Sequence, residues 1–361
     1  MDFTLSSEQV LIKESVARFA SGEHDGRDHW STFAELGWLA IGAPDEAGGF
    51  GGPIETLLVA EQLGRGLVTS PYVTQGVLAR TILQNAGDHA LLQPLVDGTR
   101  RVAVAYEEPG ARGEPGSVQT AAVRDGDGYV LRGRKVRALD TGSADTIIVS
   151  ARTPEGTTLL TVPAGAPGLT RMPYDAEDGH DAADITFDGA RADGVVGAPG
   201  SGLELLELGL DHALAAVCAE ALGIASVMLE ATVDYTKQRQ QFDVPIGSFQ
   251  ALQHRMAEMF IEVELMRSMA FLAAMTLADA SDAATRRRTI SSAKVQIARS
   301  GRFVGQQAIQ LHGGIGMSEE YRVGRYFKRL TILERLFGDA TFHLARFGSS
   351  VNSAQREAVP A

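Results

Sequence analysis

Residues 203–239 read LELLELGLDHALAAVCAEALGIASVMLEATVDYTKQR, a long helical pattern that is apolar on one face. Two further patterns of this kind follow it, FQALQHRMAEMFIEVELMRSMAFLAAMTLADA at 249–280 and RTISSAKVQIARSGRFVGQQAIQLHG at 288–313. Helices of this length normally pack against one another as a bundle. Residues 203–361 are therefore predicted to form a C-terminal helical bundle.

The chain upstream of this bundle changes character twice. At 101–202, short β-branched runs such as VAVAY, DTIIVSA and TTLLTV alternate with turn clusters, which predicts a middle β domain. At 1–100, helical spacing returns between Gly-rich turns, which predicts a helical N-terminal domain. The fold class is therefore mainly α with a central β domain. A chain of 361 residues is long for one core and suits two or three domains.

Charge and cysteine content exclude several classes of function. The chain has 33 Lys and Arg against 45 Asp and Glu, a net charge of −12, which would repel nucleic acid and anionic membranes. Its single cysteine, Cys218, excludes an internal disulfide and a cysteine-based metal cluster. Cys218 lies in an apolar stretch and is predicted to be a buried structural thiol. We expect no metal site.

The first residues, MDFTLSSEQVLIKESVARFA, contain acids and no uninterrupted apolar run. They therefore resemble neither a signal peptide nor a membrane span, and we expect a cytoplasmic protein. Ser6 followed by Gln9 instead predicts a capped amphipathic helix.

Two segments in the last third have a more specific composition than packing requires. In YTKQRQQFDVPIGSFQALQHRMAEM (235–259), polar and aromatic side chains surround a Pro-Gly turn between two long helices, namely Arg239, Gln241, Phe242, Gln250 and Gln253. In AIQLHGGIGMSEEYRVGRYFKR (308–329), a helix that carries Gln310 and His312 runs into Gly313, Gly314 and Gly316. Both segments are candidates for ligand binding.

The glycines of the second segment have two interpretations. Paired glycines commonly end a helix through a left-handed residue. Alternatively, their missing side chains let backbone N–H groups approach a phosphate or an adenine, with Arg239 as the countercharge. A Rossmann fingerprint is excluded because no strand precedes these glycines.

Together these segments resemble the acyl-CoA dehydrogenase family in wording, order and separation. The similarity extends to PDEAGGFGG (44–52) and to VQTAAVRDGDGYVLRGRKV (118–136), and so covers nearly the whole chain. The resemblance implies a helical N-terminal domain, a β-barrel-like middle domain and a C-terminal four-helix bundle that hold FAD. It also implies a reaction in which a Glu removes a proton beside the acyl-CoA thioester and hydride passes to the flavin.

The catalytic Glu of the family is missing from this sequence. It occurs in the family at one of two places, an E-G-T triplet or a bundle helix. These places correspond here to Phe337, Gly338 and Asp339 and to Ala213, so neither carries the base. The nearest acids are Asp211, Glu334 and Asp339. The sequence therefore predicts no catalytic residue in this chain.

The flavin-ring motifs of the family have also changed. The loop T-E-P-x-x-G-S-D begins here with Glu107, Glu108 and Pro109, and the W-I-T triplet reads Arg137, Ala138, Leu139. These replacements remove an aromatic surface and a hydroxyl group, and they add a negative charge near a ring that becomes anionic on reduction.

The other half of the family's FAD site is retained. In the family, one subunit lends its neighbour contacts to the adenosine and pyrophosphate of FAD. The corresponding cofactor-binding residues here are Arg239, Phe242, Gln250, Gln310, Gly313 and Gly314. One departure, Asp243 where the family usually has Gly, puts the local turn in question.

The resemblance therefore favours a base-lacking subunit of a heteromeric acyl-CoA dehydrogenase, with α2β2 composition. A catalytic partner would supply the Glu and bind most of the acyl-CoA, and an electron-transfer flavoprotein would accept the electrons. By analogy with divided family members, the substrate is a bulky acyl-CoA such as a steroid side chain. Two alternatives stay open: a self-sufficient homotetramer that uses Asp339 or another acid, and a structural module without cofactor.

Overall fold

The computed structural model describes residues 4–22, 24, 28–279, 282–318 and 321–357. The chain forms two compact units that do not follow the order of the sequence. One unit comprises residues 26–52 and 69–213, and the other comprises residues 1–25, 53–68 and 214–361. We call them the sheet unit and the bundle unit.

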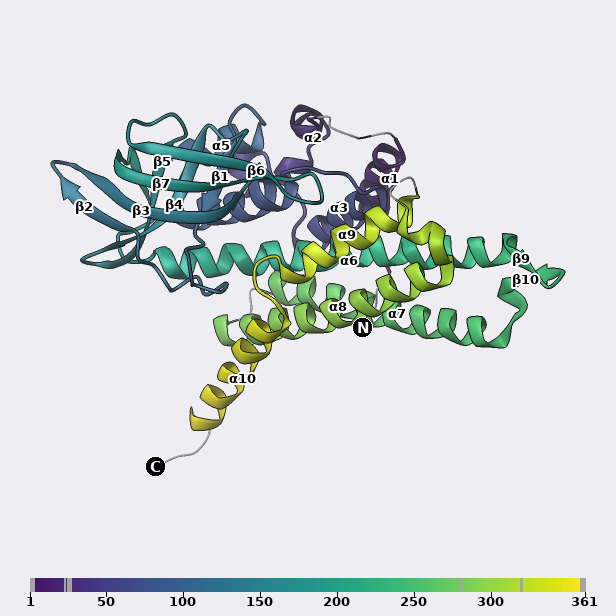
Figure 1. Cartoon of the computed structure of the whole chain (residues 1–361). Coiled ribbons are helices and arrows are strands. Elements are labelled where there is room, and N and C mark those ends of the chain that lie inside the picture. Colours follow the sequence, from purple (N-terminus) through teal and green to yellow (C-terminus); the bar gives the residue numbers. More distant parts are fainter. Residues whose placement is uncertain (1–3, 23, 25–27, 280–281, 319–320, 358–361) are drawn as a thin grey trace. The chain divides into compact units, whose positions relative to one another are not determined.

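The sheet unit is built around an 8-stranded sheet in the order β6-β7-β3-β2-β4-β5-β8, with β1 paired to β4 (Figure 1). Its core contains the inward-facing apolar residues of several strands, among them Leu131, Ile147 and Ile185, all fully buried. The strands are β1 (Val102–Ala105), β2 (Ala121–Asp125), β3 (Gly128–Leu139), β4 (Thr146–Thr153), β5 (Gly156–Pro163), β6 (Leu169–Asp175), β7 (Asp181–Arg191) and β8 (Gly194–Val196).

Short helices complete the sheet unit. Tyr72–Ala79 is a π-helix whose residues are all buried, so its apolar composition carries no amphipathic signal. The helices of this unit are α2 (Trp30–Glu35), η1 (Trp38–Ala40), η2 (Asp45–Ala47), η3 (Tyr72–Ala79), α4 (Arg80–Ala86) and α5 (His89–Val96).

The bundle unit consists of long helices with a small hairpin between two of them (Figure 1). Glycines allow α3 and α6 to approach closely, because a Cβ at Gly223 would lie 2.0 Å from the Glu61 carbonyl oxygen. A buried ion pair between Glu220 and Arg329, with Nε and Oε1 2.6 Å apart, links α6 to α9. The elements are α1 (Ser7–Ala20), α3 (Pro53–Gly66), α6 (Gly202–Gln238, whose residues 202–213 are counted in the sheet unit), β9 (Gln240–Gln241), β10 (Val244–Pro245), η4 (Ile246–Ser248), α7 (Gln250–Ala278), α8 (Ala283–His312), η5 (Gly313–Met317), α9 (Arg322–Arg335) and α10 (Ala340–Glu357).

Several local predictions are confirmed. Ser6 and Gln9 form a capping box at the start of α1. Cys218 is fully buried, and burial raises the pKa of its thiol to about 12. Helix α6 is long and apolar enough to cross a membrane, but 83% of its most apolar window is buried inside the protein, as in a globular core helix.

The expected fold class, mainly helical with a central sheet, is confirmed. Helices give way to strands between Val96 and Val102, and strands to helix between Val196 and Gly202. The compact units nevertheless cut across these positions, since both draw on residues before 100. The division at 1–100, 101–202 and 203–361 therefore stays a prediction.

Candidate functional site

The first candidate segment forms a tight hairpin between α6 and α7. Strands β9 and β10 pair Gln241 with Val244, and the two residues between them are Phe242 and Asp243. Both are left-handed, with φ of 53° and 65°, as a two-residue type I′ turn requires. Aspartate tolerates this conformation better than most residues. The hairpin therefore forms despite Asp243, and it leaves the Phe242 side chain 87% exposed.

Backbone hydrogen bonds fix Arg239 at the base of this hairpin. Its N–H donates to the Tyr235 carbonyl oxygen at 2.8 Å, and its carbonyl accepts from the Ile246 N–H at 2.8 Å. The Arg239 side chain is exposed. Gln250, also exposed, is the first residue of α7. The turn thus holds the backbone of Arg239 in place while its guanidinium group faces solvent.

The glycines of the second segment have different structural reasons. Gly313 ends α8 with φ 64° and ψ −142°, a conformation suited to glycine alone. Gly316 is packed, because a Cβ there would lie 3.0 Å from the Ile309 carbonyl oxygen. A Cβ at Gly314 would meet nothing within 4 Å, and the φ of Gly314 is not left-handed. Among the residues that the structure describes, neither packing nor backbone conformation therefore requires glycine at position 314.

Aromatic stacking brings the two segments together. The His312 ring stacks on Tyr235, with centroids 4.6 Å apart, and lies 5.2 Å from Tyr321. Burial lowers the pKa of His312, so the ring is neutral near pH 7 and serves as a flat packing surface. Because Tyr235 lies four residues before Arg239 and His312 two after Gln310, both segments meet at one end of the bundle. We call this end, residues 235–256 and 307–318, the bundle tip.

All the residues predicted to bind cofactor lie on the bundle tip and are exposed: Arg239, Phe242, Gln250, Gln310, Gly313 and Gly314. The tip also exposes apolar side chains, including Met317 at 75% and Ile315 at 46%. The donors of the predicted cofactor-binding residues are one guanidinium, two amides and the backbone N–H groups around the glycines, which suits an anionic or nucleotide ligand. The role of these residues in binding stays a prediction.

The two changed ring motifs meet in the sheet unit. Arg137 Nε donates to Glu107 Oε2 at 2.9 Å, and Arg137 Nη2 forms an ion pair with the same carboxylate. Lys135 pairs with Ile185 and Ala138 with Ala183, so Val136 and Arg137 form a bulge opposite Asp184. Although partial burial alone would lower the pKa of Arg137, the Glu107 carboxylate raises it overall.

The neighbouring acid, Glu108, forms a different kind of pair. Its Oε1 lies 2.7 Å from Lys135 Nζ, and both side chains are almost fully buried. Glu108 also accepts the backbone N–H groups of Gln119 and Thr120 at 2.7 and 2.9 Å. Burial alone would raise the pKa of Glu108, but Lys135 and these N–H groups lower it overall. Adjacent glutamates thus serve a surface pair and a core pair.

Both positions of the family base carry other residues. Ala213 is buried in α6. Phe337 is 6% exposed with φ 58°, and its carbonyl oxygen lies 3.1 Å from His343 Nε2. Asp339 accepts the Phe342 N–H at 2.9 Å, which caps the start of α10. The loop that carries the base in the family is therefore filled by a buried phenylalanine and a helix cap.

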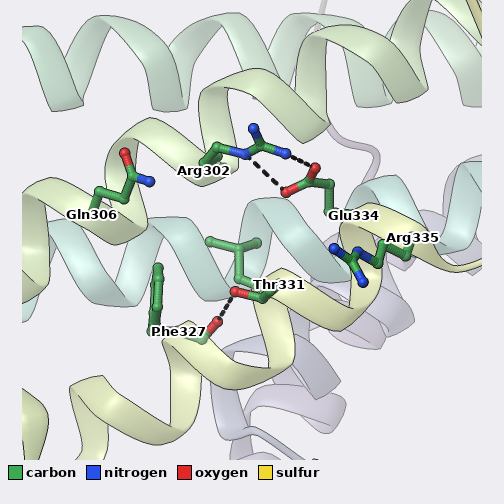
Figure 2. A pocket seen from close by; sticks show the side chains of 8 residues that line it. Arg302, Gln306, Phe327, Thr331, Glu334 and Arg335 are labelled. Atoms are coloured by element: carbon green, nitrogen blue, oxygen red, sulfur yellow. Dashed lines mark hydrogen bonds and ion pairs between the residues drawn. The ribbon is translucent and has the colours of Figure 1, made fainter. Parts of the chain in front are cut away.

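Glu334 and Asp339 border a groove between α8, α9 and α10. An ion pair between Arg302 and Glu334, with Nε and Oε2 3.1 Å apart, crosses the groove (Figure 2). Cavities of about 220 and 440 Å³ lie beside it, and the larger one is also lined by Arg299 and Asp339. Both acids thus lie in an arginine-rich setting away from the bundle tip residues that define the candidate site.

Sequence reasoning missed the Glu107–Arg137 pair, although it noted both residues separately. The signal was the joint appearance of opposite charges at two positions that the family fills with neutral side chains. Only the strand register and the β3 bulge reveal that these positions touch.

Comparison with known proteins agrees with the resemblance. Residues 6–98, 103–190 and 200–351 match the N-terminal, middle and C-terminal domains of acyl-CoA dehydrogenase. The probable acyl-CoA dehydrogenase YngJ of Bacillus subtilis is 33% identical, over 96% of this chain and 98% of YngJ. The solved steroid ACAD Tcur3481-Tcur3483 is 30% identical, with a TM-score of 0.87 over 98% of this chain and 100% of that chain. One chain of the ChsE4-ChsE5 complex from Mycobacterium tuberculosis is 27% identical, with a TM-score of 0.86 over 100% of this chain and 100% of that chain.

Proposed function

The chain belongs to the acyl-CoA dehydrogenase family, and from that premise we propose that it is the base-lacking subunit of a heteromeric acyl-CoA dehydrogenase. The family is one of oxidoreductases, and FAD is the cofactor. In our proposal this chain lends FAD contacts to a catalytic partner in an α2β2 assembly. The partner supplies the proton-abstracting Glu and binds most of the acyl-CoA.

One observation carries the proposal: the bundle tip keeps a glycine that the chain itself does not need. Gly314 is exposed and its φ is not left-handed, and a Cβ there would meet no described residue within 4 Å, so its lack of a side chain serves no contact in the described part of the chain. A ligand or a second chain that lies against the tip accounts for it. The exposed Arg239 and Gln310 beside it have the donor chemistry for the pyrophosphate and adenosine of FAD.

The tip residues fit the adenosine half of FAD, whereas the base positions do not fit catalysis. FAD when bound accepts the hydride removed from the acyl-CoA. Arg239 would neutralise pyrophosphate charge, Gln250 and Gln310 would hydrogen-bond, and Gly313 and Gly314 would let the backbone approach closely. Neither Ala213 nor Phe337 can take up a proton. Proton abstraction is therefore left to the partner.

The substrate class and the other partners follow by analogy. Two solved relatives support a bulky substrate and a divided enzyme, since one is a steroid ACAD and the other a complex of two named chains. We propose a steroid side-chain or similarly bulky acyl-CoA. An electron-transfer flavoprotein is the proposed electron acceptor, and the cytoplasm the proposed location.

The proposal is tested by co-expressing the chain with a base-containing acyl-CoA dehydrogenase homologue and measuring FAD in the purified complex. Arg239→Ala and Gln310→Ala should each weaken FAD binding about tenfold or more, because each removes a contact to the cofactor. Arg299→Ala is the matched control, since Arg299 is an exposed arginine of α8 outside the tip. Unchanged flavin content in both tip variants would favour a cofactor-free module.

The self-sufficient alternative is tested at Asp339. Asparagine also caps helices well, so Asp339→Asn retains the start of α10 and removes only the carboxylate. Our proposal expects unchanged turnover of the complex. A loss of a hundredfold or more would instead assign the base to this chain.

A further inference from the structure

Glu107 and Arg137 form one structural unit, although 30 residues separate them in sequence. Their side chains form the ion pair described above, with the guanidinium Nε 2.9 Å from Oε2. Their backbones are also joined, because the Val136 N–H donates to the Glu107 carbonyl oxygen at 2.9 Å. The Tyr106 hydroxyl donates to the other carboxylate oxygen at 3.3 Å. The pair is thus held by several contacts.

Each member of the pair needs the other. The Glu107 side chain is only 14% exposed, so without Arg137 its carboxylate would be largely removed from water and lack its cation. Arg137 has φ 51° at the β3 bulge, where its N–H donates to Asp184 Oδ1 at 3.3 Å. The bulge therefore orients the Arg137 side chain, and its guanidinium group balances the negative charge of Glu107.

We infer that the Glu107–Arg137 pair closes the flavin-ring position of this chain's own sheet unit, so that the unit rejects the isoalloxazine ring. This inference deepens the proposed function and rests on it, because it explains why a flavin would be held by the partner's ring site only. The positions are those at which the resemblance places a ring-contacting hydroxyl and an aromatic side chain. A ring there would have to strip water from a charged pair and lie beside a carboxylate, which opposes the anionic reduced flavin.

The surrounding framework is intact, so the closure is local. Glu108 follows Glu107 in sequence, and Lys135 lies two residues before Arg137. These two residues form a buried ion pair, with Lys135 Nζ 2.7 Å from Glu108 Oε1. Lys135 Nζ also donates to Ser150 Oγ at 2.9 Å. Because these contacts lie beneath the exposed pair and do not involve it, replacing Glu107 and Arg137 should change the surface without unfolding the sheet.

The experiment titrates the full-length chain with FAD and records the shoulders of the visible flavin absorbance band, which report the surroundings of the ring. The variant is Glu107→Thr with Arg137→Trp, which restores a hydroxyl and a flat aromatic surface. We expect FAD added to the wild-type chain to show no change in these absorbance shoulders, which we call the ring signal. The double variant should show this signal and bind FAD about tenfold more tightly. Arg132→Ala, which breaks an exposed ion pair between Arg132 of β3 and Asp188 of β7, should behave as wild type. A ring signal in wild type equal to that of the double variant would overturn the inference, and so would a folded double variant without any gain.

A second set of variants decides the question if the double variant does not fold. Arg137→Lys keeps the positive charge and should bind FAD with the affinity of wild type. Arg137→Gln removes the ion pair with Glu107 and should bind FAD about threefold more tightly. Equal binding by all three proteins would contradict the inference. The proposed function fails by a different result, since it is tested at Arg239 and Gln310 through the flavin of the partner. Either idea can therefore fail while the other stands.

Discussion

The bundle tip and the Glu107–Arg137 end of the sheet have diverged from the family to different degrees. At the tip, the residues of the family pattern are present and exposed, and no contact with the described residues requires glycine at Gly314. At the sheet end, the family residues are replaced by side chains that satisfy one another. Under the proposed function, the difference teaches that residues lent to a neighbour can persist while residues of the chain's own site are converted to internal contacts.

The loop at Phe337 differs from the family in the same way as the Glu107–Arg137 positions. Phe337 is buried, and Asp339 caps α10, so the replaced residues again have internal roles. Lys294 is fully buried beneath this loop and donates to the Leu333 carbonyl oxygen. The first residue at the family's base position in this loop is therefore packed into the protein.

The largest expected effect is on the free energy of unfolding, and it compares the buried Glu108–Lys135 pair with the exposed Glu107–Arg137 pair. Lys135→Met removes the cation of the buried pair and leaves the Glu108 carboxylate in the core, so we expect a loss of about 3–5 kcal/mol in the free energy of unfolding. Urea denaturation of the full chain measures it. A loss below about 1 kcal/mol would mean that the framework does not depend on this pair.

The second effect concerns the Phe337 loop and pH. Burial, with Lys294 and Arg346 nearby, lowers the pKa of His343 to about 3, from 6.5. The unfolded chain therefore binds a proton below pH 6.5 that the folded chain does not, and stability falls as pH decreases from about 6.5 toward 3. From pH 7 to 5 we expect a loss of about 2 kcal/mol from this residue. Comparing urea midpoints of wild type and His343→Gln at both pH values checks it; parallel losses would exclude His343 as the source.

The third effect tests the tip by separating folding from binding. Gly314→Leu should change the free energy of unfolding by less than about 0.5 kcal/mol, because open space receives the side chain. It should nevertheless reduce FAD affinity in the complex about tenfold by blocking close approach. The control is Gly316→Leu, which should destabilise the turn because a Cβ there lies 3.0 Å from backbone. Full flavin content in the Gly314 variant would show that Gly314 is not needed for FAD binding, which contradicts the role proposed for the bundle tip.

The smallest expected effect is on stability at the exposed pair itself. Arg137→Ala should cost about 1 kcal/mol in the free energy of unfolding. The Arg137 side chain is 63% exposed, so water screens part of the interaction, but the Glu107 carboxylate left behind is only 14% exposed. Thermal unfolding of this variant beside Lys135→Met gives the comparison directly. Similar losses of stability in the two variants would show that the Glu107–Arg137 pair supports the fold as much as the buried Glu108–Lys135 pair does.

Much of the fold follows from periodicity along the chain. Helices α6, α7 and α8 were predicted because their apolar faces repeat over many turns, and strands β4 and β5 because β-branched runs are bounded by turns. Strand β6 was not predicted, since most of Leu169–Asp175 is exposed and gives no apolar alternation. Helical spacing at 72–87 predicted the helix there, but not that Tyr72–Ala79 is a π-helix, because that helix type depends on backbone hydrogen bonds and not on side-chain spacing.

The candidate site could be predicted in part. Sequence motifs identified Arg239 and Gly314, and stacking of Tyr235 on His312 places their segments at one end of the bundle. Sequence alone could not separate Gly314 from Gly316, because their different needs depend on which atoms lie nearby. Nor could it pair Glu107 with Arg137, because that contact depends on a bulge in strand register.

The exposed ring of Phe242 at the hairpin has a consequence for how the protein is produced in the cell. An apolar side chain that is 87% exposed at a protruding turn, with Phe249 beside it at 37%, favours self-association when no neighbour covers it. If the chain is a subunit of a heteromeric enzyme, as proposed, the copies made in excess of the partner would be the ones that aggregate or are degraded. Its synthesis would then have to be matched to that of the partner.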